Sequence, residues 1–166
     1  MTEQWSEIEH FRGKYLVSTY GNILNASRDQ LVRQSVNAQG IAKVNLSVDN
    51  YKYCRSVALL VCHTFKPHWS QHFDSVINLD GDRRNNHVDN LEPRPHWFAY
   101  KYHRQFKQGY KIRWVKPFRD QETGIEYPNS LAVATHFGIL DSDVYEATKA
   151  NTFTFPTNQF FEFVEM

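Results

Sequence analysis

The stretch VINLDGDRRNNHVDNLE, residues 76–92, carries the strongest signal for the fold of this chain. It begins with apolar residues typical of a strand. It continues into Asp80-Gly81, which suits a tight turn because glycine accepts a positive φ and aspartate accepts a backbone hydrogen bond. We therefore predict a β-hairpin followed by a helix that begins near Asn86. Three amide side chains are expected to cap and cross-brace the loop: Asn85, Asn86 and Asn90.

This stretch resembles the centre of phage-type HNH homing endonucleases. The shared features are the Asp-Gly turn, the Asn-Asn pair four residues after Gly81, and the Asn-Leu that closes the motif. In that family an Asp-His pair precedes the turn, where the Asp ligates a divalent metal and the His activates water against a scissile phosphate. The two positions here read Ile77-Asn78. Because Ile cannot coordinate a cation and the Asn amide cannot take a proton near neutral pH, the resemblance implies a nuclease scaffold without its chemistry.

The resemblance also marks what would remain of the catalytic centre. Asn90 matches the central Asn that orients the catalytic His, and nine residues further on, where the family has another ligand, this chain has Ala99. His96 could replace that ligand only if the local helix were shifted, so we favour an imidazole packed between Pro95 and Trp97 and predict no metal site. The positions predicted to be vestiges of the catalytic centre are Asn78, Asp80 and Asn90.

Charge is segregated along the chain, although the formal net charge is only +1. Residues 1–50 carry five basic and five acidic side chains, residues 51–119 carry thirteen and five, and residues 120–166 carry one and eight. Nucleic-acid binding depends on local cation density, because each neutralised phosphate releases condensed counterions. The middle segment therefore favours DNA contact, whereas the last segment opposes it.

Cations alternate with aromatic rings between Tyr100 and Trp114. In the related nucleases this region is a helical connector that follows the minor groove, where Lys and Arg meet phosphates. A solvated basic surface is the alternative, but the excess of positive charge over 51–119 favours DNA contact. The predicted DNA-binding residues are Lys101, Arg104, Lys107, Lys111 and Arg113, with Arg83 and Arg84 at the hairpin.

The N-terminal part of the chain reads as strands. Aromatic and β-branched residues between Trp5 and Ile23, and the alternation over 42–47, are typical of a small sheet. This pattern resembles the sheet module ahead of the HNH core in phage nucleases, where it lies against the major groove. A miniature β core without DNA contact explains the same residues equally well. The apolar segment 56–65 that follows predicts a short helix.

The C-terminal part resembles the helix-turn-helix module of the same nucleases. We expect a hairpin from residue 120, a first helix from about 131, a turn at Gly138 and a second helix over roughly Asp141–Ala150. Acidic groups near the start of the second helix stabilise the helix but oppose an approaching phosphate. The module is therefore expected either to read few bases or to face a basic protein partner.

Together these patterns predict an α+β fold with a small antiparallel sheet module, a ββα-metal-like (HNH) core and a C-terminal helix-turn-helix-like module. The predicted segments are 1–50, an N-terminal β-rich DNA-binding module; 51–99, a degenerate HNH ββα core; 100–119, a basic connector; and 120–166, an acidic helix-turn-helix-like module.

Three functions follow from the sequence and stay open at this point. The first is a DNA-binding protein descended from a phage HNH homing endonuclease, without nuclease activity, that acts as a regulator or site-occupying factor. The second is an atypical nickase that places Asn78, Asp80, Asn90 or His96 around a metal. The third is an inhibitor of a host or phage protein that acts through the acidic C-terminal module.

The expected partner is double-stranded DNA, with a host or phage protein added under the third hypothesis. No cofactor is expected, and Mg²⁺ or Mn²⁺ would be needed only by a nickase. No apolar run approaches the length of a membrane span, and the N-terminus lacks a basic region followed by an apolar one. We therefore expect a phage-encoded protein in the cytoplasm of a bacterial host.

Overall fold

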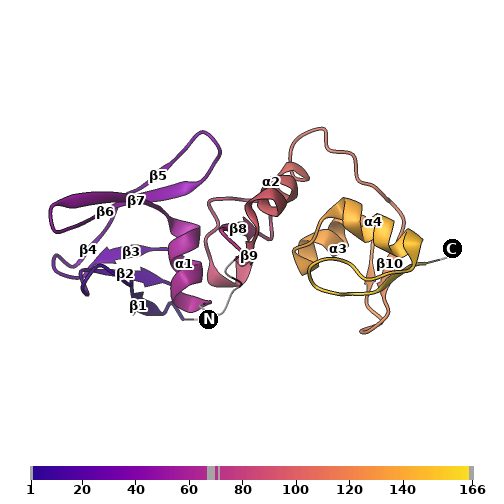
Figure 1. The fold of residues 1–166 in the computed structure, drawn as a ribbon, viewed down its shortest axis with the longest axis horizontal. Helices are drawn as coiled ribbons and strands as arrows, with labels where there is room; N and C mark the ends of the chain where they lie inside the picture. The colour runs from indigo at the N-terminus through magenta and orange to yellow at the C-terminus, as the bar shows by residue number, and fades with distance from the viewer. Residues whose placement is uncertain (1, 67–69, 71, 165–166) are drawn as a thin grey trace. The chain divides into compact units, whose positions relative to one another are not determined.

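The computed structural model describes residues 2–66, 70 and 72–164, and its contacts divide the chain into two units. The first unit comprises the residues up to Asn78 together with Asp82–His96; the second comprises Leu79–Gly81 and the residues from Trp97 onward. Each unit combines helix with small antiparallel sheets, so the predicted α+β class is confirmed (Figure 1). Within the described part of the chain, no helix is long and apolar enough to cross a membrane.

The first unit contains two small sheets, a helix and a hairpin. One sheet has the strand order β1-β2-β3-β4, the other has the order β5-β6-β7, and β8 pairs with β9. The bounds are β1 Trp5–Glu7, β2 Tyr15–Ser18, β3 Ile23–Asn25, β4 Gln30–Leu31, β5 Gln34–Val36, β6 Ala42–Val48, β7 Tyr51–Ser56, α1 Val57–Phe65, β8 Ser75–Asn78, the 3-10 turn η1 Val88–Asn90 and β9 Leu91–Arg94.

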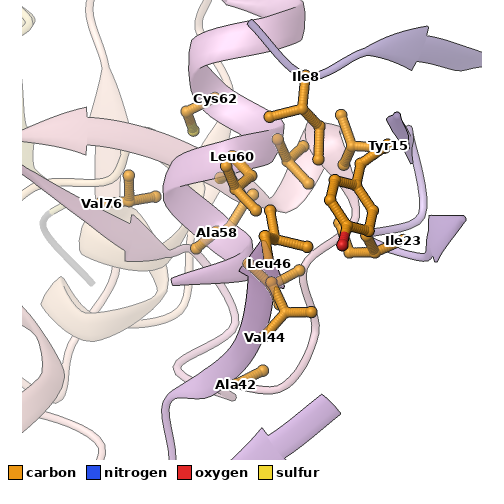
Figure 2. Packing of buried hydrophobic residues seen from close by; sticks show 14 of the residues in the cluster. Ile8, Tyr15, Ile23, Ala42, Val44, Leu46, Ala58, Leu60, Cys62 and Val76 are labelled. Carbon is orange, nitrogen blue, oxygen red and sulfur yellow. The ribbon is translucent and has the colours of Figure 1, made fainter. Parts of the chain in front are cut away.

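One hydrophobic core serves this whole unit. Along β6 the side chains alternate, with Val44 and Leu46 buried and Asn45 exposed, as a half-buried strand requires. Figure 2 shows these β6 residues gathered with Tyr15 of β2, with the apolar face of α1 and with Val76 of β8. Each fully buried Val or Leu contributes about 1.5–3 kcal/mol. The predicted segments 1–50 and 51–99 therefore share a core, and the boundary between them falls in the β6–β7 hairpin.

That hairpin turns through two residues in the left-handed region. Val48 pairs with Tyr51, and between them Asp49 and Asn50 have φ values of 51° and 66°. Two positive φ values in a two-residue loop are typical of the type I′ turn, whose twist matches that of the strands it joins. The module boundary predicted after residue 50 therefore falls directly after this turn.

The hairpin predicted from residues 76–92 is confirmed, because β8 pairs antiparallel with β9. The helix predicted to begin near Asn86 is wrong: only the single turn η1 forms there, and the chain then enters β9. The reason lies in Pro93 and Pro95, which hold the residues before them extended and cannot continue a helix. The helix α2 begins at His96, whose backbone N–H donates to the carboxylate of Asp74 at 2.7 Å.

The second unit contains three helices and one small sheet among its described residues. The sheet has the order β11-β10-β12, and α3 lies beside α4 (Figure 1). The bounds are α2 His96–Arg104, β10 Phe118–Asp120, β11 Glu126–Tyr127, α3 Ser130–Phe137, α4 Asp141–Ala150 and β12 Phe161–Phe163.

The predicted helix-turn-helix is confirmed. Asn129 caps α3 by accepting from the backbone N–H of Ala132, and Gly138 ends that helix with a φ of 63°. A residue in this left-handed conformation is a common helix terminator, and glycine adopts it without a steric cost. A buried core that includes Phe118, Val133 and Phe161 joins the sheet to α3 and α4. The predicted boundary between residues 119 and 120 falls inside β10, the central strand of this sheet.

The region that resembled a helical connector is helical only to Arg104. Residues 105–117 form turns and irregular backbone, with Gly109 at a φ of 81°. Gly81 belongs to the short segment Leu79–Gly81 of the same unit. It has a φ of 79°, and a Cβ at this position would clash with the ring of Phe106. The predicted Asp-Gly turn therefore requires glycine both for its backbone conformation and for this close approach.

Candidate functional site

The centre of the β8–β9 hairpin is closed by two amides. Asn78 is almost completely buried, and its Nδ2 donates to the carbonyl oxygen of Asn85 at 2.8 Å. Nδ2 of Asn90 donates to the same oxygen, also at 2.8 Å. The expected cross-bracing of the loop is therefore confirmed. Asn78, which the resemblance places at the general-base position, therefore holds this loop.

The residues around this hairpin do not fit a divalent metal. Ile77 is completely buried and offers no donor atom at the position where the family has a ligand. Among the described residues, no group of three His, Cys, Asp or Glu side chains could hold a metal ion. Asp80 is exposed in the second unit, and His96 is exposed instead of enclosed by Pro95 and Trp97 as predicted.

The two arginines predicted at the hairpin both have interaction partners within the first unit. Nη1 of Arg83 donates to the carbonyl of Gln39 at 3.2 Å, and burial lowers the pKa of this guanidinium from its ordinary value. It stays charged at neutral pH all the same. Arg84 is exposed and its Nε lies 3.3 Å from Oδ1 of Asp82.

The other predicted DNA-binding residues lie together in the second unit. They line one groove of about 590 Å³, and the start of α4 closes it with Leu140 and Ser142. The cations along this basic groove are Lys101, Arg104, Lys107, Lys111 and Arg113. Residues separated by up to twelve positions thus form a single positively charged surface, of the kind that neutralises a phosphate backbone.

Comparison with known proteins agrees with the fold described above. Residues 3–55 match the NUMOD4 motif. A solved structure showing DNA binding and cleavage by the HNH homing endonuclease I-HmuI aligns with 98% of this chain and 99% of that one, at a TM-score of 0.56 and 19% identity. The chain has the fold of an HNH homing endonuclease. A search of curated protein sequences found no match. The resemblance inferred from residues 76–92 is thereby confirmed at the level of fold.

Within this HNH endonuclease fold, one buried carboxylate holds the irregular segment that carries the groove cations. Asp141, the first residue of α4, is completely buried, and its Oδ2 accepts from the hydroxyl of Tyr110 at 2.8 Å and from the backbone N–H of Arg113 at 3.0 Å. Its own N–H donates to Oε1 of Gln105 at 3.0 Å. Burial, together with the bond to Asp141, raises the pKa of the Tyr110 hydroxyl to about 12, so this donor keeps its proton.

The acidic start of α4 therefore has a role that its sequence did not suggest. We expected Asp141 to oppose phosphate from the surface, but its charge is buried and bound to the basic segment. Asp143 is half-buried, and burial raises the pKa of its carboxyl, while Lys101 favours the charged form. Earlier in the chain, Arg119 lies between Glu126 and Glu162, with N–O distances of 2.7 and 3.0 Å. Part of the negative charge of the last segment is thus compensated inside the unit.

Replacing Asp141 by alanine is expected to destabilise the second unit and weaken DNA binding together. The change leaves the Tyr110 hydroxyl and the Arg113 N–H without their acceptor, at a cost of roughly 3 kcal/mol. Urea unfolding would measure the loss of stability, and a duplex binding titration would measure the effect on the groove.

Two control variants make this test specific. Asp141→Asn keeps an acceptor oxygen and should lose less stability than Asp141→Ala. Glu146→Ala removes an exposed carboxylate from the same helix and should change neither quantity by much. An Asp141→Ala protein as stable as the parent would show that the groove segment is held by other contacts.

Sequence analysis predicted the groove cations but not the aromatic rings that two of them contact. Lys101 lies over the ring of Trp97 and Arg104 over the ring of Tyr100, at 5.4 and 5.7 Å from the ring centroids. The signal was available, because residues four apart on a helix are neighbours. The anchoring role of Asp141 had no comparable local signal.

Proposed function

We propose that the protein binds duplex DNA through the basic groove and does not cut it, acting as a regulator or as a factor that occupies a DNA site. The observation that carries the proposal is the convergence of the five predicted cations on one groove. The HNH endonuclease fold and the NUMOD4 match of residues 3–55 support a DNA partner.

Loss of cutting is supported by the hairpin centre. The two residues at the family's catalytic positions are a buried Ile and an Asn whose amide braces the loop. The same proposal includes a phage origin and a place in the cytoplasm of a bacterial host. It also includes contact between DNA and the polar outer face of the β5-β6-β7 sheet.

The proposal is tested by removing groove cations that make no ring contact. The double variant Lys107→Ala/Lys111→Ala is expected to bind duplex DNA roughly 100-fold more weakly near 0.1 M salt, because each lost phosphate contact costs roughly tenfold there. Since phosphate contacts carry no sequence information, the loss should be similar on unrelated DNA sequences. Fluorescence anisotropy with labelled duplexes would measure it.

A matched control is Lys149→Ala. This lysine is exposed in the last turn of α4 and does not line the groove. It should leave affinity almost unchanged. Equal losses in the control and the double variant would mean that binding follows total charge and not the groove.

A further inference from the structure

The helix α2 presents two aromatic rings to solvent on one face. Trp97 is 52% exposed and Tyr100 is 59% exposed, which is unusual for rings of this size on a helix that also buries Phe98 and Tyr102. Positions 97, 100, 101 and 104 follow the i, i+3, i+4 spacing that places residues on one side of a helix. We call Trp97, Tyr100, Lys101 and Arg104 the aromatic face.

Contacts within the second unit hold the aromatic face in place. The ring of Phe155 stacks against Trp97 at 6.3 Å and 19°, and on the buried side of the helix the hydroxyl of Tyr102 donates to the carbonyl of Leu79 at 2.9 Å. Each exposed ring carries a cation within cation–π range, Lys101 on Trp97 and Arg104 on Tyr100. Trp97 thus contacts Phe155 and Lys101, and Tyr100 contacts Arg104, while each of the two aromatic residues stays about half exposed.

The aromatic face is continuous with the basic groove. Lys101 and Arg104 belong to both, because they line the groove and also contact the two rings. A strand whose phosphates follow the groove would bring its bases to these rings. Proteins bind single-stranded DNA by this combination: cations contact the phosphate backbone, and neighbouring aromatic rings stack on the bases. Every base can stack in this way, because every base has a flat face.

We propose that the aromatic face of α2 stacks on unpaired bases of DNA, so that the protein prefers a site with a locally opened strand over a fully paired duplex. The inference rests on the proposed function in that the groove supplies the backbone contact. Unpaired bases are required because the bases of a closed duplex stack on one another and offer their faces to no side chain.

The test compares a fully paired oligonucleotide duplex with the same duplex carrying a central bubble of mismatched thymines. Wild-type protein should bind the bubble at least about fivefold more tightly, and Trp97→Ala and Tyr100→Ala should each remove at least about fivefold of bubble affinity. Affinity for the paired duplex should fall much less than bubble affinity in both variants, because there each ring only positions one groove cation. Trp97→Phe keeps a flat ring and should restore most of the bubble affinity.

Phe153→Ala is the matched control, because Phe153 is 62% exposed in the same unit but lies outside the aromatic face. It should affect neither DNA. Circular dichroism of every variant would check that α2 and its unit remain folded.

The outcomes separate this inference from the proposed function. Duplex binding without any preference for the bubble would overturn the stacking inference and leave the groove proposal standing. Equal loss on both DNAs in Trp97→Ala would also overturn it, since the ring would then serve only to position Lys101. If the wild-type protein binds neither DNA, the proposed function fails first and the inference fails with it.

Discussion

Purified protein is expected to leave duplex DNA uncut in the presence of Mg²⁺ or Mn²⁺. Loss of one general base lowers a rate by about 10²–10⁴, and loss of the adjacent metal ligand removes the Lewis acid as well. Both losses coincide here, because Ile77 has no donor atom and the amide of Asn78 is bonded to the carbonyl of Asn85. Conversion of supercoiled phage and host DNA to nicked and linear forms is the measurement.

A contaminating nuclease must be distinguished from activity of this chain. Metal-dependent nicking that disappears in Asn78→Ala or His96→Ala protein would contradict the prediction and establish the nickase. Nicking that is the same in the parent and both variants would be assigned to a contaminant.

Restoring the family's pair at positions 77 and 78 is not expected to restore cutting. Ile77→Asp would place a carboxylate at a completely buried position, and an unpaired buried charge costs several kcal/mol. Ala99 would still provide no donor atom at the remaining position where a metal ligand is expected. Thermal unfolding should therefore show a much larger loss of stability for Ile77→Asp than for Asn78→His alone, with neither variant cutting DNA.

Duplex affinity is expected to fall steeply with salt concentration. The logarithm of the binding constant changes by about −0.9 per neutralised phosphate, so the five groove cations predict a slope of about −4.5 against the logarithm of salt concentration. Between about 50 and 200 mM salt this amounts to a loss of roughly 500-fold in affinity. Titrations at several salt concentrations would give the slope directly.

The slope also reports which cations take part. Contact by Arg83 and Arg84 in addition would steepen it to about −6, whereas Lys107→Ala/Lys111→Ala should flatten it by about two units. Arg83 already donates to Gln39, so its participation would require that bond to rearrange. Binding that is independent of salt would contradict a groove that acts on phosphates.

Elements that depend on neighbouring residues were predicted from a local apolar pattern or from the resemblance to a helix-turn-helix module. The second helix of the helix-turn-helix was predicted over roughly Asp141–Ala150, and α4 has these bounds. The resemblance placed the turn at Gly138, and this residue ends α3 in the left-handed conformation, which glycine adopts without a steric cost. The apolar run 56–65 likewise contains α1. In each case the responsible residues lie within a few positions of the element.

Predictions failed where a distant contact or a competing local rule decided the outcome. The helix expected near Asn86 does not form, because Pro93 and Pro95 direct the chain into β9 first. The boundary expected after residue 50 falls in a hairpin, since the strands on either side share one core.

The sequence by itself predicted the α+β class and, through the resemblance to HNH homing endonucleases, Ile77-Asn78 in place of a catalytic pair. Local charge density also predicted the five cations that line the groove. Only the tertiary structure decided that Asn78 and Asn90 brace one carbonyl, and that Asp141 is a buried anchor instead of a surface acid. The physical reason is that hydrogen-bond partners far apart in sequence, such as Tyr110 and Asp141, meet only after folding. After folding, the Asp141 side chain accepts hydrogen bonds from the segment that carries the groove cations instead of facing an approaching phosphate.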